Sequence, residues 1–345
     1  MNRPKTSRRT RIAASLWLVI SACASDQTPP LPKPAFQPTR LEAPFDVASS
    51  RAAMGAPAAG FVCADPLRSA RDGGEVERSK LDDFVRAVAD MSDAYVRANP
   101  AEPAPARCAL YWLDAWALEE ALLGRPRRGE ARIARERALA GLSLAYLKIR
   151  DEESLPRDRK ELVEAWLAAV AHATLSGAIA REAGAIAHDR VYWAALAAAA
   201  SGAASGDRGL FVWGIARCRA ALSEHDAIGA LTLREELQIL TPLVMTAELA
   251  AANRVDLYAE HDRAIDRRIG RVRDALDDGG RLRAVSAREP FAGEFSGALL
   301  AWGELYVARF SDPLLSRWVA RYRPLRNPWL GGDVTLVFAP RRALR

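Results

Sequence analysis

Apolar residues recur every three or four positions through most of this chain. Between residues 81 and 95 they fall on one stripe of a helix that ends before Asn99-Pro100. Comparable patterns occupy further segments: Ala109–Leu123, Ala131–Lys148, Lys160–Ala180, Val191–Ala204, Gly209–Leu222, Leu231–Ala252, Asp262–Leu276, Ser296–Phe310 and Pro313–Arg321. Alternation of period two, typical of a strand, is found only in the short Val334–Phe338 segment. The sequence therefore predicts an all-α fold.

Alanine supplies much of this pattern, as in Ala197–Ala200 and Ala250–Ala252. It is the strongest helix former, and its small side chain lets neighbouring helices approach closely. Antiparallel helices of this kind can stack into a right-handed array, a bundle or a closed α/α toroid. A repeat of about 34 residues with the tetratricopeptide pattern is not visible, which makes that solenoid the weaker option.

The first 22 residues have the layout of a secretory signal. Arg8, Arg9 and Arg11 form a positive region, and the uncharged stretch 12–22 follows. As a helix, that stretch would span about 16 Å, roughly half of a ~30 Å hydrocarbon core, so it is too short to cross a membrane permanently. The junction Ile20-Ser21-Ala22-Cys23 resembles the lipobox of bacterial lipoproteins. An ordinary signal with an incidental cysteine is the alternative.

The lipobox resemblance implies cleavage before Cys23 and lipidation of that cysteine. We therefore expect a periplasmic protein that touches the membrane through its lipid anchor alone. Because Ala24 and not an aspartate follows, we expect the outer membrane. Residues 23–45 would form the lipidated tether, whose Asp26–Pro44 stretch carries six prolines and favours an extended conformation. The remaining domain would cover residues 46–345.

Removal of the signal changes the charge balance. The chain has 49 Lys and Arg against 43 Asp and Glu, but five of the basic residues and no acidic ones precede Cys23. The mature chain would then carry 44 basic against 43 acidic residues. This balance argues against nucleic-acid binding, because proteins that bind nucleic acids concentrate positive charge where they contact the phosphates.

Three cysteines remain after Cys23, in a compartment that permits disulfides. We expect a bridge between Cys63 and Cys108, which flank the first helices, and a buried free thiol at Cys218. The four histidines lack a zinc-ligand spacing, and no CxxC motif is present. The sequence thus predicts neither a metal site nor a cofactor.

Five short segments stand out along the chain, in this order: Cys108–Ala117, Leu142–Lys148, Tyr192–Ala195, Asn253–Leu257 and Leu330–Thr335. In sequence and in order they resemble the bacterial alginate lyases that act on polymannuronate in the periplasm. The resemblance extends over about residues 63–340. It implies an incomplete α/α toroid of antiparallel helices, crossed by a groove for an acidic polysaccharide, a polyuronate.

Aromatic residues on successive predicted helices are candidates for that groove. Trp112, Trp116, Tyr146 and Trp193 would stack their flat rings against the apolar faces of pyranoses. The alternative, open for each of them, is that the ring fills the core.

The resemblance departs from the family at its catalytic motif. The family carries Asn-Asn-His-Ser before its Tyr-Trp pair, whereas residues 188–191 here read His-Asp-Arg-Val, which puts Arg190 in the place of the catalytic histidine. In a rearranged lyase, Arg190 or Arg234 would neutralise the uronate carboxylate, and His188 or Tyr192 would transfer protons. We expect the helix to begin at or after Arg190, where this residue can converge with the others on a concave surface.

Three functions remain open at this point. The first is polyuronate cleavage by β-elimination in the cell envelope. The second is binding or export of the polymer without catalysis, and the third is a helical envelope scaffold for a protein partner. A scaffold would present an exposed apolar patch and no lined groove.

Overall fold

A computed structural model describes residues 40–54, 61–69, 76–98, 102–124, 129–175, 189–225, 231–277 and 296–339. The predicted signal peptide, Cys23, most of the tether and His188 lie outside these ranges. Within them, no helix is long and apolar enough to cross a membrane.

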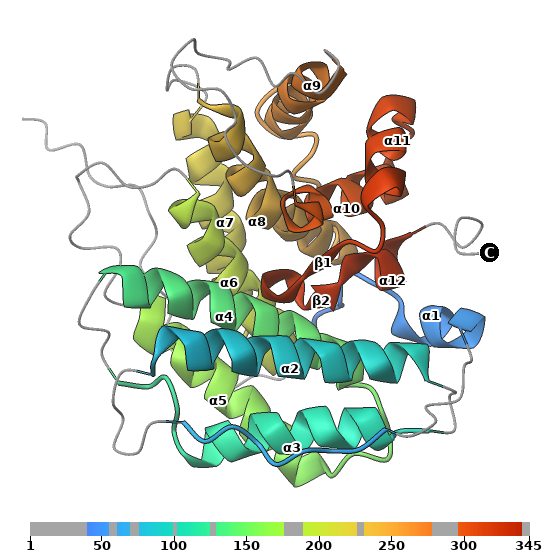
Figure 1. Cartoon of the computed structure of the whole chain (residues 1–345). Helices are drawn as coiled ribbons and strands as arrows, with labels where there is room; N and C mark the ends of the chain where they lie inside the picture. Colours follow the sequence, from blue (N-terminus) through green and yellow to red (C-terminus); the bar gives the residue numbers. More distant parts are fainter. Residues whose placement is uncertain are drawn as a thin grey trace, which may run out of the picture.

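The described residues are mostly helical, with two short strands, which confirms the predicted fold class (Figure 1). The α-helices are α1 (Val47–Met54), α2 (Arg78–Arg97), α3 (Ala104–Leu118), α4 (Gly129–Ile149), α5 (Arg157–Leu175), α6 (Arg190–Ser205), α7 (Arg208–His225), α8 (Leu233–Ala252), α9 (Ala264–Asp277), α10 (Ala301–Arg309), α11 (Pro313–Tyr322) and α12 (Val334–Phe338). Within the described residues, the 3-10 helices are η2 (Gly297–Leu300) and η3 (Pro328–Leu330).

Helix α6 lies at the centre of the domain and packs against α4, α5, α7 and α8. Every residue from Val191 to Ala204 is buried, so this helix has no polar face. Close backbone approach to α7 makes two glycines necessary. A Cβ at Gly214 would lie 2.6 Å from the Ala195 carbonyl oxygen, and one at Gly202 would lie 2.5 Å from the Phe211 nitrogen.

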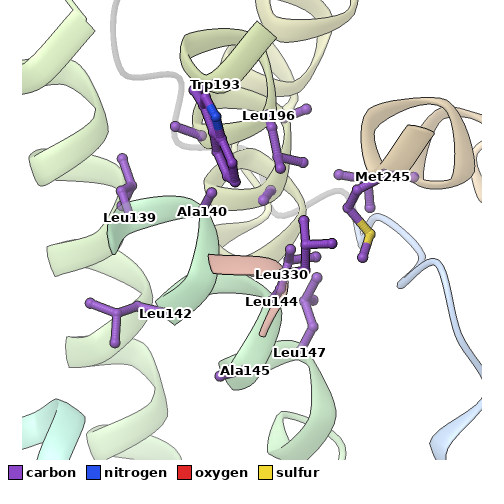
Figure 2. Close-up of a cluster of buried hydrophobic side chains, with 14 of the residues drawn as sticks. Leu139, Ala140, Leu142, Leu144, Ala145, Leu147, Trp193, Leu196, Met245 and Leu330 are labelled. Carbon is purple, nitrogen blue, oxygen red and sulfur yellow. The ribbon is translucent and has the colours of Figure 1, made fainter. Parts of the chain in front are cut away.

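The core around α6 draws side chains from elements far apart in the sequence (Figure 2). Trp193 and Leu196 of α6, Leu144 of α4, Met245 of α8 and Leu330 near the end of the chain are all buried there. One hydrophobic cluster therefore joins the first and last thirds of the domain.

The predicted strand at Val334–Phe338 is wrong, because this segment forms the short helix α12. Its N-cap is Asp333, whose carboxylate accepts a hydrogen bond from the Leu336 amide at 3.2 Å. Over five residues an apolar run fits either a helix or a strand, and the cap decides between them. The two strands instead flank η3: β1 (Arg326–Asn327) pairs antiparallel with β2 (Gly332–Asp333).

The predicted disulfide between Cys63 and Cys108 is confirmed, with their Cα atoms 5.6 Å apart. It ties residues 61–69, which we call the strap, to α3. Cys218 is a fully buried free thiol, as expected.

A buried polar network joins α2, α4 and the turn at residues 330–333. The Lys148 ammonium pairs with Asp93 and donates to the Gly331 carbonyl at 2.7 Å, while the Asp333 amide donates to the second Asp93 oxygen at 2.7 Å. Gly332 has a φ of +115°, and a Cβ there would lie 2.4 Å from the Asp93 carboxylate. The turn can approach the carboxylate this closely because position 332 is glycine.

We predict that Lys148→Met lowers the free energy of unfolding by about 3–5 kcal/mol, because it leaves the buried Asp93 carboxylate without its counter-charge. Urea unfolding at pH 7 measures the change. The control is Lys80→Met on α2, where no ion pair is formed among the described residues. Equal stability of the two variants would contradict a structural role for the pair.

Candidate active site at the start of helix α6

Helix α6 begins at Arg190, which confirms the expected start at or after this residue. Asp189 occupies the N-cap position, and its side chain makes no capping hydrogen bond. Both side chains are instead directed to arginine and glutamate residues of α4, the helix that lies against α6.

Glu136 of α4 is the centre of this contact. Its side chain is completely buried. Arg132 Nε lies 3.8 Å from one carboxylate oxygen, and Arg190 Nε lies 3.8 Å from the other. Neither oxygen accepts a hydrogen bond from the described residues, although buried carboxylates normally do. The carboxyl group is therefore surrounded by positive charge without being closely paired.

Arg137, the next residue of α4, holds the N-cap of α6. Its guanidinium donates to Asp189 at 2.7 Å and lies 5.3 Å from the centre of the Trp193 ring. We call Arg132, Glu136, Arg137, Asp189 and Arg190 the Glu136 cluster. Three guanidinium groups thus gather at the start of α6.

Burial raises the pKa of Glu136 to about 8, although Arg132 and Arg137 oppose the shift. Asp189 contributes to the rise as a neighbouring negative charge. A carboxyl group with such a pKa can gain or lose a proton near neutral pH, as a general acid or base must. Because Glu136 is fully buried and the arginines beside it do not give up their protons, it could influence a substrate only by positioning those arginines.

The arginines of the cluster keep part of their side chains accessible. The exposed fractions are 28% for Arg137, 17% for Arg132 and 12% for Arg190. Arg190 therefore keeps some contact with solvent, although it lies beside the buried Glu136. Planar guanidinium groups at such a position suit the bidentate recognition of a carboxylate.

Tyr192 and Trp193 follow Arg190 on α6 and are buried in the core. Tyr192 has no exposed surface, so it does not share an open surface with Arg190 in this structure. Two positions apart on a helix, side chains point about 200° away from each other. The proton-transfer role of Tyr192 stays a prediction, as does that of His188, which lies outside the described residues.

The aromatic residues of the earlier helices occupy the core, one of the two alternatives that the sequence leaves open. Trp112 and Trp116 of α3 are buried, and their indole N–H groups donate to the strap carbonyls of Ala64 and Leu67. Phe84 stacks on Trp116 with ring centroids 3.6 Å apart. These indoles therefore hold the strap in place.

Tyr146 of α4 is also fully buried and donates to Glu164 at 2.7 Å. Burial and the negative charge of Glu164 raise the pKa of its phenol. Arg234 is an exposed residue in the first turn of α8, two positions after Thr232. Thr232 forms a capping box with Glu235 there. The structure thus brings Arg190 to the three cluster residues of α4 and places Tyr146 and Arg234 on other parts of the domain.

The described residues contain no group of three histidine, cysteine or acidic side chains that could hold a metal. A cavity of 620 Å³ is lined by residues 42–48 and, among others, by Arg51, Tyr95 and Arg150. Arg51 lies over the Tyr95 ring at 3.7 Å and pairs with Glu152, so these side chains already bind each other.

Comparison with known proteins places this chain in a family. The family model described as alginate lyase matches residues 64–281. An alginate lyase of Azotobacter vinelandii is 33% identical over 259 residues, which cover 68% of this chain and 66% of that protein. The chain belongs to the alginate lyase family. A polysaccharide lyase of Stenotrophomonas maltophilia is 32% identical over 272 residues, covering 74% of this chain and 78% of that protein.

Solved structures show the same fold. Alginate lyase A1-III in complex with a tetrasaccharide matches with a TM-score of 0.73 at 24% identity, over 86% of this chain and 95% of that one. Alginate lyase A1-III from Sphingomonas species A1 gives a TM-score of 0.70 at 22% identity. The expected incomplete α/α toroid is therefore confirmed. The matched part of this alginate lyase family member spans just under two thirds of the A. vinelandii protein.

Three residues of the Glu136 cluster were not singled out from the sequence. Arg132 and Glu136 are four positions apart and so share one face of α4, with Arg137 next to them. The signal available in the sequence is that these charged residues interrupt an apolar helix. The same pattern is typical of an exposed helix surface. Only the position of α6 shows that these charged residues belong to a buried cluster and not to such a surface.

We predict that Glu136→Gln removes a pH dependence of stability. The raised pKa means that the folded state binds the Glu136 proton more tightly than the unfolded state, whose pKa is near 4.5. Stability is therefore lost as pH rises from about 4.5 to about 8. Urea unfolding at a series of pH values should show the wild type losing stability relative to Glu136→Gln over that range. Parallel curves would contradict the shifted pKa.

Proposed function

We propose that this chain cleaves a polyuronate by β-elimination at the Glu136 cluster. Membership of the alginate lyase family supports the reaction class, and the gathering of three arginines at the start of α6 is the observation that supports the site. The substrate class is an acidic polysaccharide, which needs positive charge where its carboxylates lie.

In this proposal, Arg190 and Arg137 neutralise the uronate carboxylate. Neutralisation stabilises the enolate that develops when the C5 proton is removed, and loss of one such donor in comparable sites costs a hundred- to thousandfold in rate. Glu136 positions Arg190 from the buried side, through the 3.8 Å contact with its Nε atom. His188, two residues before Arg190 in the sequence, is the proposed proton-transfer group, with Tyr192 as the further candidate. Arg234 is the alternative to Arg190 for neutralising the carboxylate.

The first test of this proposal is release of unsaturated uronates, followed by absorbance, from a panel of polyuronates. We expect Arg190→Ala to abolish release and to weaken polymer binding by about 1.5–3 kcal/mol, the range for hydrogen bonds to charged groups. The control is Arg157→Ala on α5, whose side chain is 90% exposed.

The outcomes separate the three functions. Polymer binding without product release by the wild type would replace cleavage by a binding or export role. Absence of both would favour a scaffold for a protein partner. Unchanged binding and cleavage in Arg190→Ala would remove the Glu136 cluster from the site.

We further propose that the mature chain is a lipoprotein anchored through Cys23 in the periplasm, at the outer membrane. The lipobox-like Ile20–Cys23 junction and the proline-rich Asp26–Pro44 stretch support this location. Two or more acyl chains on one cysteine give stable anchoring.

We predict that Cys23→Ala prevents lipidation and leaves an uncleaved precursor. Metabolic labelling with a radioactive fatty acid should mark the wild type and not the variant, and Cys218→Ala should be labelled like the wild type. Equal labelling of Cys23→Ala would contradict the anchor.

A further inference from the structure

Asp82 of α2 is a half-buried acid without a close ion pair. Its side chain is 29% exposed, and Arg78 Nε on the same helix lies 3.9 Å from one carboxylate oxygen. The other oxygen is buried and accepts no hydrogen bond from the described residues, although buried polar atoms normally have a partner. The contacts of the fold therefore leave part of this carboxylate unsatisfied.

The packing of α2 on α4 brings Asp82 next to the Glu136 cluster (Figure 1). Val85 of α2 meets α4 at Gly141, where a Cβ would lie 3.1 Å from Val85 Cγ1. The buried ion pair between the two helices lies further along both of them, so the helices run in the same direction. Asp82 is three positions before Val85, and Arg137 is four positions before Gly141. Each therefore lies about one turn earlier on its own helix, beside the other.

The electrostatics of Asp82 agree with this register. The positive charge of Arg137 acts on the Asp82 carboxylate, and Arg137 Nε is itself a buried donor that bonds to none of the described residues. Burial raises the pKa of Asp82, although three neighbouring arginines oppose the shift. A carboxylate with a raised pKa is a stronger base than an ordinary aspartate.

The two acids inside the Glu136 cluster are less suited to reach a substrate. Glu136 has no exposed side-chain surface. Asp189 is 12% exposed and already accepts a hydrogen bond from Arg137 at 2.7 Å. A general base must come within hydrogen-bond reach of the proton that it removes. Asp82 combines accessible surface with an unsatisfied oxygen, and so it meets this requirement better than either.

We infer that Asp82 is a catalytic residue, the base that removes the C5 proton of a uronate whose carboxylate is bound by Arg137. The inference rests on the proposed function and adds a group of α2 to its proton-transfer candidates. C5 carries the carboxylate of the sugar as its direct substituent. A base beside the guanidinium that binds this carboxylate is therefore also beside the C5 proton.

The elimination balances with this assignment. Asp82 takes the C5 proton, and the electron pair of the C5–H bond forms the C4–C5 double bond. The C4–O4 bond breaks with its electron pair on O4. O4 takes a proton from the proton-transfer group proposed near the start of α6, and Asp82 returns its proton to that group through water. No oxidant, reductant or further reactant is consumed.

The test measures product release from polymannuronate by absorbance and polymer binding by calorimetry, both on the full chain. Asp82→Asn keeps the size of the side chain and removes the base. We expect it to lower kcat about a hundred- to ten-thousandfold without weakening polymer binding, since a negative charge near a polyanion is removed. Asp82→Glu keeps the base but displaces it, and we expect a smaller loss of about ten- to a hundredfold.

Asp83→Asn is the matched control, because it makes the same change on the next residue of α2, whose side chain is 59% exposed. Release unchanged in Asp82→Asn, reduced equally in Asp83→Asn, or lost only in proportion to polymer binding would overturn the role of Asp82. Circular dichroism establishes that each variant folds. If Asp82→Asn does not fold, Asp82→Glu decides, and an unchanged kcat in that variant would overturn the inference.

The same experiment separates this inference from the lyase proposal. Product release by the wild type and by Asp82→Asn alike would refute the role of Asp82 and leave the proposed cleavage standing. Absence of release by the wild type from every polyuronate would refute both.

Discussion

The buried pair of Lys148 and Asp93 is the interaction on which the closure of this domain depends. It joins α2 to α4, and both partners also bind the backbone of the turn at residues 330–333. Burial of an ammonium group and a carboxylate at this depth is favoured by further hydrogen bonds: Lys148 also donates to the Gly331 carbonyl, and the second Asp93 oxygen accepts from the Asp333 amide. The last part of the chain is therefore attached to the first helices by charge as well as by the apolar contacts of Leu330.

This pair belongs to a wider pattern in which buried acids bind basic side chains closely. In the C-terminal half, carboxylates of α8 and α10 meet guanidinium groups at 2.6–2.9 Å: Glu236 with Arg268 and Arg271, Glu248 with Arg309, and Glu304 with Arg323. Glu136 differs, because its contacts with Arg132 and Arg190 are 3.8 Å long and its oxygens accept no hydrogen bond from the described residues. A buried acid that is less well satisfied than its counterparts is more readily explained by function than by stability.

The sequence predicted the fold because the fold follows from local patterns. The stripe between residues 81 and 95 becomes α2, and the alanines after Tyr192 become the buried helix α6. The Val334–Phe338 segment was assigned wrongly because its cap, Asp333, acts through a side chain that hydropathy does not report. The candidate site was predicted only in part. Arg190 was identified through a resemblance, but its partner Glu136 is 54 positions away, and no local pattern links the two.

The turn at residues 330–333 also shows that the segment matched by the family model and the segment needed for folding are different. The family model ends at residue 281, whereas Lys148 and Asp93 need the Gly331 carbonyl and the Asp333 amide. A fragment cut at 281 would keep the whole match to the family model and would expose a buried lysine, its carboxylate and one side of α4. The family model thus ends before the folded domain does, because the last buried charges of the domain are satisfied by residues 331 and 333.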